Sequence, residues 1–262
     1  MNAPIRDLPS PARPAEIDED EWAQRLELAA CYRLFVHLGW TEMIFNHITL
    51  RVAGDEPHFL INPYGLHYSE VTARNLVKVD IRGNVIGASA YPINPAGFVI
   101  HAAIHAHRPD AHCIIHTHTT AGIAVACKRD GLQFDNFYSA QFWNSVAYHD
   151  FEGVTTDLAE QQRLVASLGD ADVLILRSHG LLVVGPSIPE AFIRSWSLQR
   201  ACEVQLAAAS MPGPNHTIPE SVLRAIPAQQ KPMQAGHSRP YQPVFDAMLR
   251  VAGIRREDLA GA

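Results

Sequence analysis

The feature that most limits the possible folds is a series of short apolar or alternating runs, each ended by a polar turn. Runs of about four to eight residues have the length of strands and are too short for buried helices. Longer stretches between them repeat their apolar residues with the period of a helix. The predicted strands cover residues 47–52, 58–62, 77–81, 112–117, 173–176 and 181–184, and the predicted helices cover residues 18–38, 96–107, 119–127, 189–209 and 243–251.

This order of elements predicts one α/β domain in which helices pack on a sheet. The 262 residues can bury a large core, and neither a repeat nor a Gly/Ser-rich linker divides the chain. We expect a flexible tail over residues 1–17, the domain over residues 18–210, and a Pro-rich extension over residues 211–262. The extension is expected to hold one helix and to pack on the same domain.

The charge balance narrows the class of partner. A net charge of -6 provides no basic face for nucleic acid or an anionic membrane. No apolar run approaches the ~20 residues that cross a bilayer, and residues 1–21 lack the apolar core of a signal peptide. The four scattered cysteines predict reduced thiols, so we expect a cytoplasmic protein without nucleic-acid or membrane partners.

Two histidines stand two residues apart at the end of an apolar run, CIIHTHTTAG at residues 113–122. In a strand, the side chains of His116 and His118 point the same way, about 6.5–7 Å apart along the chain. Imidazoles can lean together over that gap and meet one ion at about 2.0–2.1 Å. His112 shares the face but lies about 13 Å from His116, which is too far to join them.

A third ligand must come from elsewhere, and His179 in LILRSHGLL is the best candidate. It also ends an apolar run, and Gly180 after it allows a sharp turn and a close backbone approach. A buried histidine can instead be a hydrogen-bonded core residue. For His101 and His105, which stand four residues apart on a predicted helix, we favour that structural interpretation.

At this point the motifs resemble those of a known family. The stretch RPDAHCIIHTHTTAGIAV at residues 108–125, followed by SHG and by a long helix with PEAF, resembles the class II aldolase/adducin family. FNHITLR at residues 45–51 and LINPYGLHYSE at residues 60–70 are similar to two further family segments, and the resemblance covers residues 18–209. It implies one three-layer α/β/α domain whose central, mainly antiparallel sheet is flanked by helices. It also implies a homotetramer with sites at subunit interfaces.

The resemblance also implies ligands and a metal. In the sugar-phosphate aldolases of this family three histidines hold zinc, and the motif places them at His116, His118 and His179. The expected cofactor is therefore one divalent metal, Zn²⁺ in the first place, with Fe²⁺ and Mn²⁺ as alternatives.

The sequence departs from the aldolases where they carry a Ser-Ser-Glu segment. Gly97 stands at the position of the proton-transferring glutamate, with Pro95 and Ala96 at those of the serines. Asn46-His47 replaces a Gly-Asn pair, and Tyr64 replaces a phosphate-binding threonine. These departures are typical of an adducin-like branch, here with all three histidines retained. Substrate contacts are predicted at Asn46, Tyr64, Gly65 and Gly97.

Without the glutamate, another group must move the proton. Tyr138 lies near where the aldolases bring a tyrosine from the neighbouring subunit, although its segment can equally be interface packing. His47 is the second candidate and Glu70 a distant third. An apolar pocket for the substrate is predicted from Phe137, Phe142 and Trp143.

These residues predict a metal-dependent lyase that polarises a small non-phosphorylated hydroxy- or oxo-compound for cleavage of a C–C bond. One alternative is a non-haem Fe(II) oxygenase or oxidative decarboxylase that uses the same three histidines. A second alternative is a non-catalytic, adducin-like binding protein. The expected partners are a small-molecule substrate and further copies of the same chain.

Overall fold

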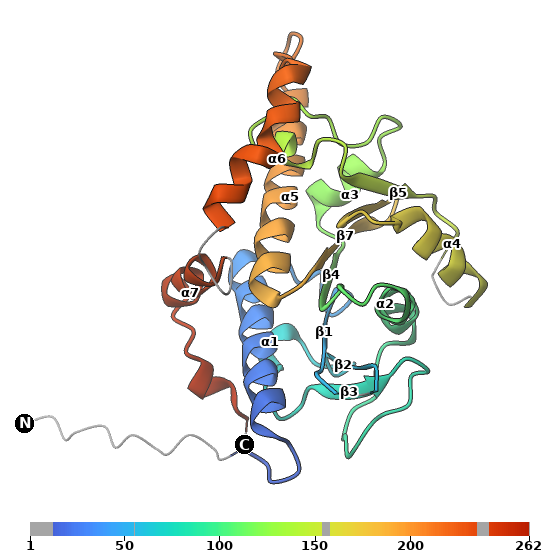
Figure 1. The fold of residues 1–262 in the computed structure, drawn as a ribbon, viewed down its shortest axis with the longest axis vertical. Coiled ribbons are helices and arrows are strands. Elements are labelled where there is room, and N and C mark those ends of the chain that lie inside the picture. The colour runs from blue at the N-terminus through green and yellow to red at the C-terminus, as the bar shows by residue number, and fades with distance from the viewer. Residues whose placement is uncertain (1–12, 55, 154–157, 235–240, 262) are drawn as a thin grey trace, which may run out of the picture.

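A computed structural model describes residues 13–54, 56–153, 158–234 and 241–261. One seven-stranded sheet runs through the domain in the order β3-β2-β1-β4-β7-β6-β5 (Figure 1). All neighbours are antiparallel except β5 and β6. The strands are β1 (His47–Arg51), β2 (His58–Ile61), β3 (Val77–Asp80), β4 (Cys113–Thr117), β5 (Val146–His149), β6 (Val173–Leu176) and β7 (Gly180–Gly185).

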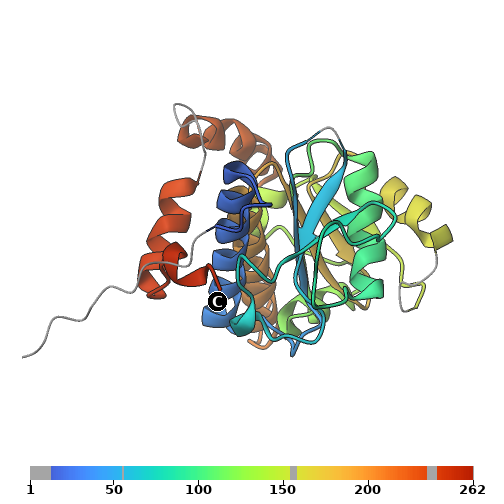
Figure 2. The same cartoon turned by 90° about the horizontal axis from the view of Figure 1, so that it is seen from below.

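Helices cover both faces of this sheet and give three layers, which can be followed from below in Figure 2. Because successive side chains of a strand point to opposite faces, Ile115 and Val183 enter the core beneath α1, α3 and α5, whereas Ile114 and Leu182 enter the core beneath α2 and α4. The predicted fold class is therefore confirmed. The helices are α1 (Glu19–Leu38), α2 (Pro95–His107), α3 (Thr120–Ala126), α4 (Leu158–Leu168), α5 (Ile188–Ala209), α6 (Glu220–Gln234) and α7 (Gln242–Val251).

Local signals explain where the helices beside the site begin and end. Asp18 accepts a hydrogen bond from the backbone N–H of Glu21 and caps α1, and Gly39 ends that helix in the left-handed conformation. Asn94 caps α2 by accepting from the N–H of Ala96, and Pro95 occupies the first helical position. The first turn of α2 lies over the start of β1, where Gly97 approaches His47.

Two elements in the middle of the chain were not predicted. Strand β5 is an edge strand that is only half-buried over most of its length, so its sequence lacks the apolar run of the central strands. Helix α4 is amphipathic, and its apolar side chains, such as Leu164 and Leu168, pack beside α2. Short amphipathic segments of this kind carry a weak signal in a single sequence.

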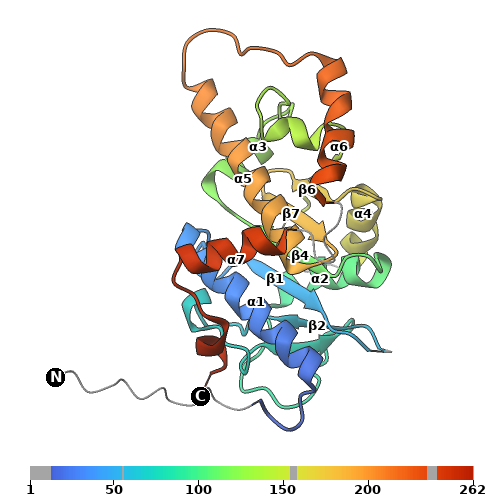
Figure 3. The ribbon, with the colours of Figure 1, turned by 60° about the vertical axis from the view of Figure 1, so that its left-hand side comes forward.

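The prediction of one helix in the C-terminal extension is wrong, because the extension forms α6 and α7. The segment of α6 contains prolines at 227 and 232, and prolines inside a helix normally interrupt it. Helix α7 lies across α1 and α5 (Figure 3). Its Phe245 is fully buried and packs edge-on against Phe192, with 5.4 Å between ring centroids. The extension therefore packs on the domain, while the division at residues 17 and 210 stays a prediction.

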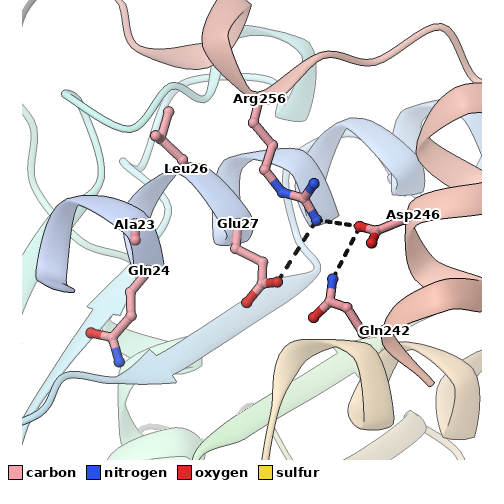
Figure 4. A pocket seen from close by; sticks show the side chains of 7 residues that line it. All are labelled: Ala23, Gln24, Leu26, Glu27, Gln242, Asp246 and Arg256. Atoms are coloured by element: carbon pink, nitrogen blue, oxygen red, sulfur yellow. Dashed lines mark hydrogen bonds and ion pairs between the residues drawn. The ribbon is translucent and has the colours of Figure 1, made fainter. Parts of the chain in front are cut away.

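A cavity of about 470 Å³ lies between α1 and α7 (Figure 4). Arg256 reaches across it to Asp246 at 2.6 Å and Glu27 at 3.8 Å, and Gln242 donates to Asp246 at 3.0 Å. The contact between Arg256 and Glu27 joins the extension to α1. Among the helices of the described residues, none combines the length and the apolar character that a bilayer span requires. The predicted tail lies almost entirely outside the described residues, since residues 1–12 are not among them.

Candidate metal centre

Three imidazoles converge where β4 ends and β6 turns into β7. His116 is the fourth residue of β4, His118 follows that strand, and His179 lies in the β6–β7 turn. One ring nitrogen of each lies within 4.8 Å of the corresponding nitrogens of the other two. The Nε2 atoms of His118 and His179 are 2.9 Å apart. The convergence expected from the sequence spacing is present, and it provides donors for one ion.

The backbone brings His179 to this place by two devices. Antiparallel pairing sets His116 opposite Leu182, so the turn that precedes β7 lies beside the end of β4. A Cβ atom at Gly180 would come within 2.3 Å of the carbonyl oxygen of Thr117, so only glycine allows this approach. The predicted close approach is therefore correct, but the residue in the left-handed conformation is Ser178, with φ of 57°, and not Gly180.

The protonation of these rings suits a cation. His116 donates from Nδ1 to the carbonyl oxygen of Leu181 at 2.9 Å, so its Nε2 carries the lone pair. That Nε2 is buried and has no hydrogen-bond partner within the described residues. Burial lowers the pKa of all three rings, to about 4 for His118. All three are therefore neutral near pH 7, and neutral imidazoles are ligands that Zn²⁺ and Fe²⁺ accept.

Asn46 supports the cluster from behind. Its Oδ1 accepts the backbone N–H of His118 at 2.9 Å, and its Nδ2 donates to the carbonyl oxygen of Trp40 and to the carboxylate of Glu42. The side chain is fully buried, and both ends of its amide are engaged. In this structure Asn46 holds the backbone of a ligand candidate, while its contact with a substrate stays a prediction.

His47 occupies the space that a side chain at position 97 would need. A Cβ atom at Gly97 would lie 2.4 Å from His47 Nε2. The ring of His47 stacks on that of His116, with centroids 5.9 Å apart and planes 18° from parallel. Asn94 Nδ2 donates to His47 Nε2 at 3.0 Å. Burial lowers the pKa of His47 well below its usual range, so this ring is also neutral near pH 7. An imidazole thus fills the space into which a side chain at position 97 would point.

The other predicted residues lie in different surroundings. Tyr138 packs edge-on against Trp196 of α5, with ring centroids 5.6 Å apart. Tyr64 is partly exposed after β2, and Gly65 next to it has a φ of +99°. The carboxylate of Glu70 accepts the backbone N–H of His67 and so closes a local turn.

The predicted aromatic pocket is not assembled around the histidines of the same chain. Phe142 and Trp143 line a cavity of about 250 Å³ together with Asp172, which precedes β6 at the end opposite His179. Phe137 is 77% exposed. The structure therefore separates Phe142 and Trp143 from the three-histidine cluster within one subunit.

Two neighbours of the cluster were missed from the sequence. Phe151 places its ring edge-on to His179, with 6.2 Å between centroids, and it is 56% exposed. Because it follows β5, which was not predicted, no sequence signal placed it there. Asn94 was missed as the partner of His47, although an Asn before a proline at the start of a helix is a recognisable cap.

The comparisons with known proteins agree with this fold. The family model described as Class II Aldolase and Adducin N-terminal domain matches residues 26–206. A Caulobacter vibrioides protein named "Putative aldolase class 2 protein" is 47% identical over 204 residues, 78% of this chain and 79% of that protein. Alpha-adducin of Rattus norvegicus is 45% identical over 222 residues, 83% of this chain and 30% of that protein. The solved structure of L-fuculose 1-phosphate aldolase from Glaciozyma antarctica PI12 is 28% identical, with a TM-score of 0.77 over 96% of this chain and 97% of that chain.

The chain therefore belongs to the class II aldolase and adducin family. This confirms the resemblance found in the motifs. Because the family includes proteins named as aldolases and others named as adducins, membership alone does not fix a reaction.

Proposed function

We propose that this protein is a metal-dependent lyase that acts on a small, non-phosphorylated hydroxy- or oxo-compound. The observation that carries the proposal is the convergence of three neutral imidazoles, His116, His118 and His179, within 4.8 Å. A divalent ion bound there, Zn²⁺ in the first place, would supply Lewis-acid polarisation of a carbonyl or hydroxyl oxygen. Three neutral ligands would leave positions open for the oxygens of a substrate.

The proposed reaction is cleavage of a C–C bond next to a carbonyl. A base takes the proton of the β-hydroxyl, that oxygen becomes a carbonyl, and the bond electrons pass to the carbon beside the remaining carbonyl. That carbon is then protonated, so no oxidant or reductant is consumed. The side chains must therefore accept one proton and return one.

We propose His47 as the proton acceptor. It stacks on His116, and its Nε2 lone pair faces Asn94 at the first turn of α2. A substrate hydroxyl that takes the place of the Asn94 amide can give its proton to the same lone pair. Tyr138 of a neighbouring subunit remains the other candidate, because within its own subunit its ring packs on Trp196.

The start of α2 supports a substrate without phosphate. Pro95, Ala96 and Gly97 offer no side-chain donor there, and the Asn94 amide already donates to His47 Nε2. Substrate contacts are proposed at Tyr64, Gly65 and Gly97, with Asn46 acting through His118. The similar structure is named L-fuculose 1-phosphate aldolase, and we expect this chain to cleave such sugar phosphates poorly.

We further propose a homotetramer in the cytoplasm whose sites lie at subunit interfaces. The ring of Phe137, which is 77% exposed, supports such an interface. Light scattering at micromolar concentration tests it, and a monomer would remove Tyr138 as a candidate acid or base.

The binding-only alternative is supported by one observation, the 45% identity to alpha-adducin. Metal analysis and turnover together decide between the alternatives. We expect protein purified without oxygen to hold about one divalent ion per chain. The ion should be lost in His116→Ala and His179→Ala and kept in His112→Ala, a control at an exposed histidine near the same strand.

Turnover is then assayed with 2-hydroxy and 2-oxo acids and with fuculose 1-phosphate, each with Zn²⁺, Mn²⁺ or Fe²⁺ loaded. The lyase is supported by chelator-sensitive cleavage of a non-phosphorylated compound. Efficient cleavage of the sugar phosphate refutes the proposed substrate class. Native iron together with oxygen-dependent turnover favours the oxidative decarboxylase. Bound metal without turnover on any substrate favours the binding protein.

A further inference from the structure

A line of buried polar side chains runs away from His47 on the side opposite Asn94. Thr49 of β1 contacts His101 and His105, which stand one turn apart on α2. All three are at most 2% exposed, so water does not satisfy them from outside. The sequence interpretation of His101 and His105 as core residues leaves open why a core needs two imidazoles and a hydroxyl there.

The direction of each hydrogen bond in this line follows from the carbonyl at its far end. The carbonyl oxygen of Ala111 can only accept, so His105 Nδ1 carries a proton and its Nε2 carries the lone pair, 3.0 Å and 2.8 Å from their respective partners. The Thr49 hydroxyl therefore donates to His105 Nε2. Its oxygen accepts from His101 Nδ1 at 2.7 Å. His101 is thus a neutral Nδ1–H tautomer with its lone pair on Nε2.

The tautomer of His47 follows independently from the opposite end. The backbone N–H of Ala96 donates to Asn94 Oδ1, so the group that Asn94 turns towards His47 is its NH₂. This amide donates to His47 Nε2, which must then be unprotonated. His47 is therefore also an Nδ1–H tautomer.

With these tautomers, one hydrogen-bond donor and one acceptor remain unassigned. Both the Nδ1–H of His47 and the Nε2 of His101 are buried without a partner in the described part of the chain. They belong to neighbouring rings, which meet edge-to-face with centroids 5.8 Å apart. Buried polar groups are seldom left unpaired, because an orphaned one has given up its hydrogen bonds to water without replacing them.

We propose that His47 Nδ1–H donates to His101 Nε2, directly or through one buried water, and that Thr49, His101 and His105 are positioning residues for His47. The hydrogen bonds then run one way from His47 through His101, Thr49 and His105 to the carbonyl of Ala111. This chain fixes the tautomer that leaves the Nε2 lone pair on the side of Gly97. The arrangement follows the general logic of a base oriented by a further group. The role in catalysis rests on the proposed function, but the existence of these hydrogen bonds does not.

The first test uses the metal-free full-length protein with ¹⁵N-labelled histidine. Long-range ¹H–¹⁵N spectra at pH 7.5 report which nitrogen of each ring carries the proton. We expect His47, His101 and His105 all to be Nδ1–H tautomers, the form that free histidine does not favour. The ring proton of His47 should be shifted downfield and protected from exchange. An Nε2–H tautomer at His47 or at His101 in the unaltered chain overturns the proposal.

Two variants interrupt the series of hydrogen bonds and one preserves it. Thr49→Val removes the hydroxyl with little change of volume, His101→Phe removes the acceptor, and Thr49→Ser keeps the hydroxyl. We expect the downfield His47 signal to be lost in His101→Phe, weakened in Thr49→Val and retained in Thr49→Ser. A His47 signal that is unchanged in both interrupting variants refutes the connection. Because Thr49→Val is the milder change, the test survives a failure of His101→Phe to fold.

A kinetic arm separates positioning from mere stability. On any compound that the enzyme turns over, Thr49→Val should lower kcat by about 10-fold to 100-fold, since small misplacements of a catalytic group have effects of that size. KM, metal content and the activity of Thr49→Ser should stay near wild type. An unchanged kcat in a variant that has lost the His47 signal refutes the positioning role. If no compound is turned over, the proposed function fails. The NMR result still decides whether the hydrogen bonds from His47 to His101 and onward exist.

Discussion

The close packing of His47 against Gly97 gives the most direct test of how the site is built. The perturbation is Gly97→Ala, which would place a Cβ atom 2.4 Å from His47 Nε2 and 2.5 Å from its Cδ2. Atoms that are not bonded do not approach so closely, so the ring or the helix must move. Overpacking of a well-packed core typically costs about 1–3 kcal/mol.

An opposing term comes from the helix itself. Alanine is favoured over glycine in a helix by up to about 1 kcal/mol. We therefore expect Gly97→Ala to lower the free energy of unfolding by about 1–2 kcal/mol. In a His47→Ala background the clash is absent, and the same change should raise that free energy by about 0.5–1 kcal/mol. The resulting coupling between the two positions is about 2 kcal/mol.

Urea unfolding of the metal-free protein measures all four members of this cycle. Ala106→Gly, an exposed position on the same helix, provides the control for the helix term. If Gly97→Ala has the same effect in both backgrounds within about 0.5 kcal/mol, the two residues do not compete for one space. The explanation of His47 as the group that replaces a side chain at position 97 would then be wrong.

Three further predictions follow from buried groups. Burial lowers the pKa of His105 from 6.5 to about 3. As the pH falls, His105 therefore takes up a proton in the unfolded chain at a higher pH than in the folded chain. Stability should therefore be full above about pH 6.5 and decline towards pH 3, by on the order of 5 kcal/mol. Urea unfolding should show a flatter decline for His105→Gln. Gly180→Ala places a Cβ 2.3 Å from the carbonyl oxygen of Thr117. We expect the free energy of unfolding to fall by about 3 kcal/mol and titration to show weaker metal binding. Near-wild-type values for both would contradict the close approach. Phe245→Ala empties a fully buried position. We expect calorimetry to show a fall of about 3–5 kcal/mol in the free energy of unfolding. A fall below about 1 kcal/mol would mean that the extension is not part of the core.

Several parts of this protein could be predicted because their signals are local. The alternation of side chains along one strand was sufficient to pair His116 with His118, and apolar runs located the central strands. Helices α1 and α5 carry caps and long periodic patterns, so their positions were predicted to within one or two residues. The third histidine, His179, was the best candidate because it also ends an apolar run before a glycine, and the resemblance of the surrounding motifs pointed to the same residue.

Other parts depend on pairings between segments that are distant in sequence. Strand β5 and helix α4 obtain their apolar environment from β6 and α2, so their own sequences show little of it. Helix α6 forms although its sequence contains two prolines. For β5 and α4 the tertiary surroundings outweighed the local propensity.

The sequence by itself determined the family, the fold class and which three histidines could share an ion. It showed that position 97 holds glycine, but it could not show what fills the space above it. That depends on the register that sets His47 opposite His116 and on the packing of α2 over β1. The orientation of His47 towards His101 was decided in the same way. A side chain's neighbours across a sheet are fixed by strand pairing and helix docking, and these join residues far apart in the chain.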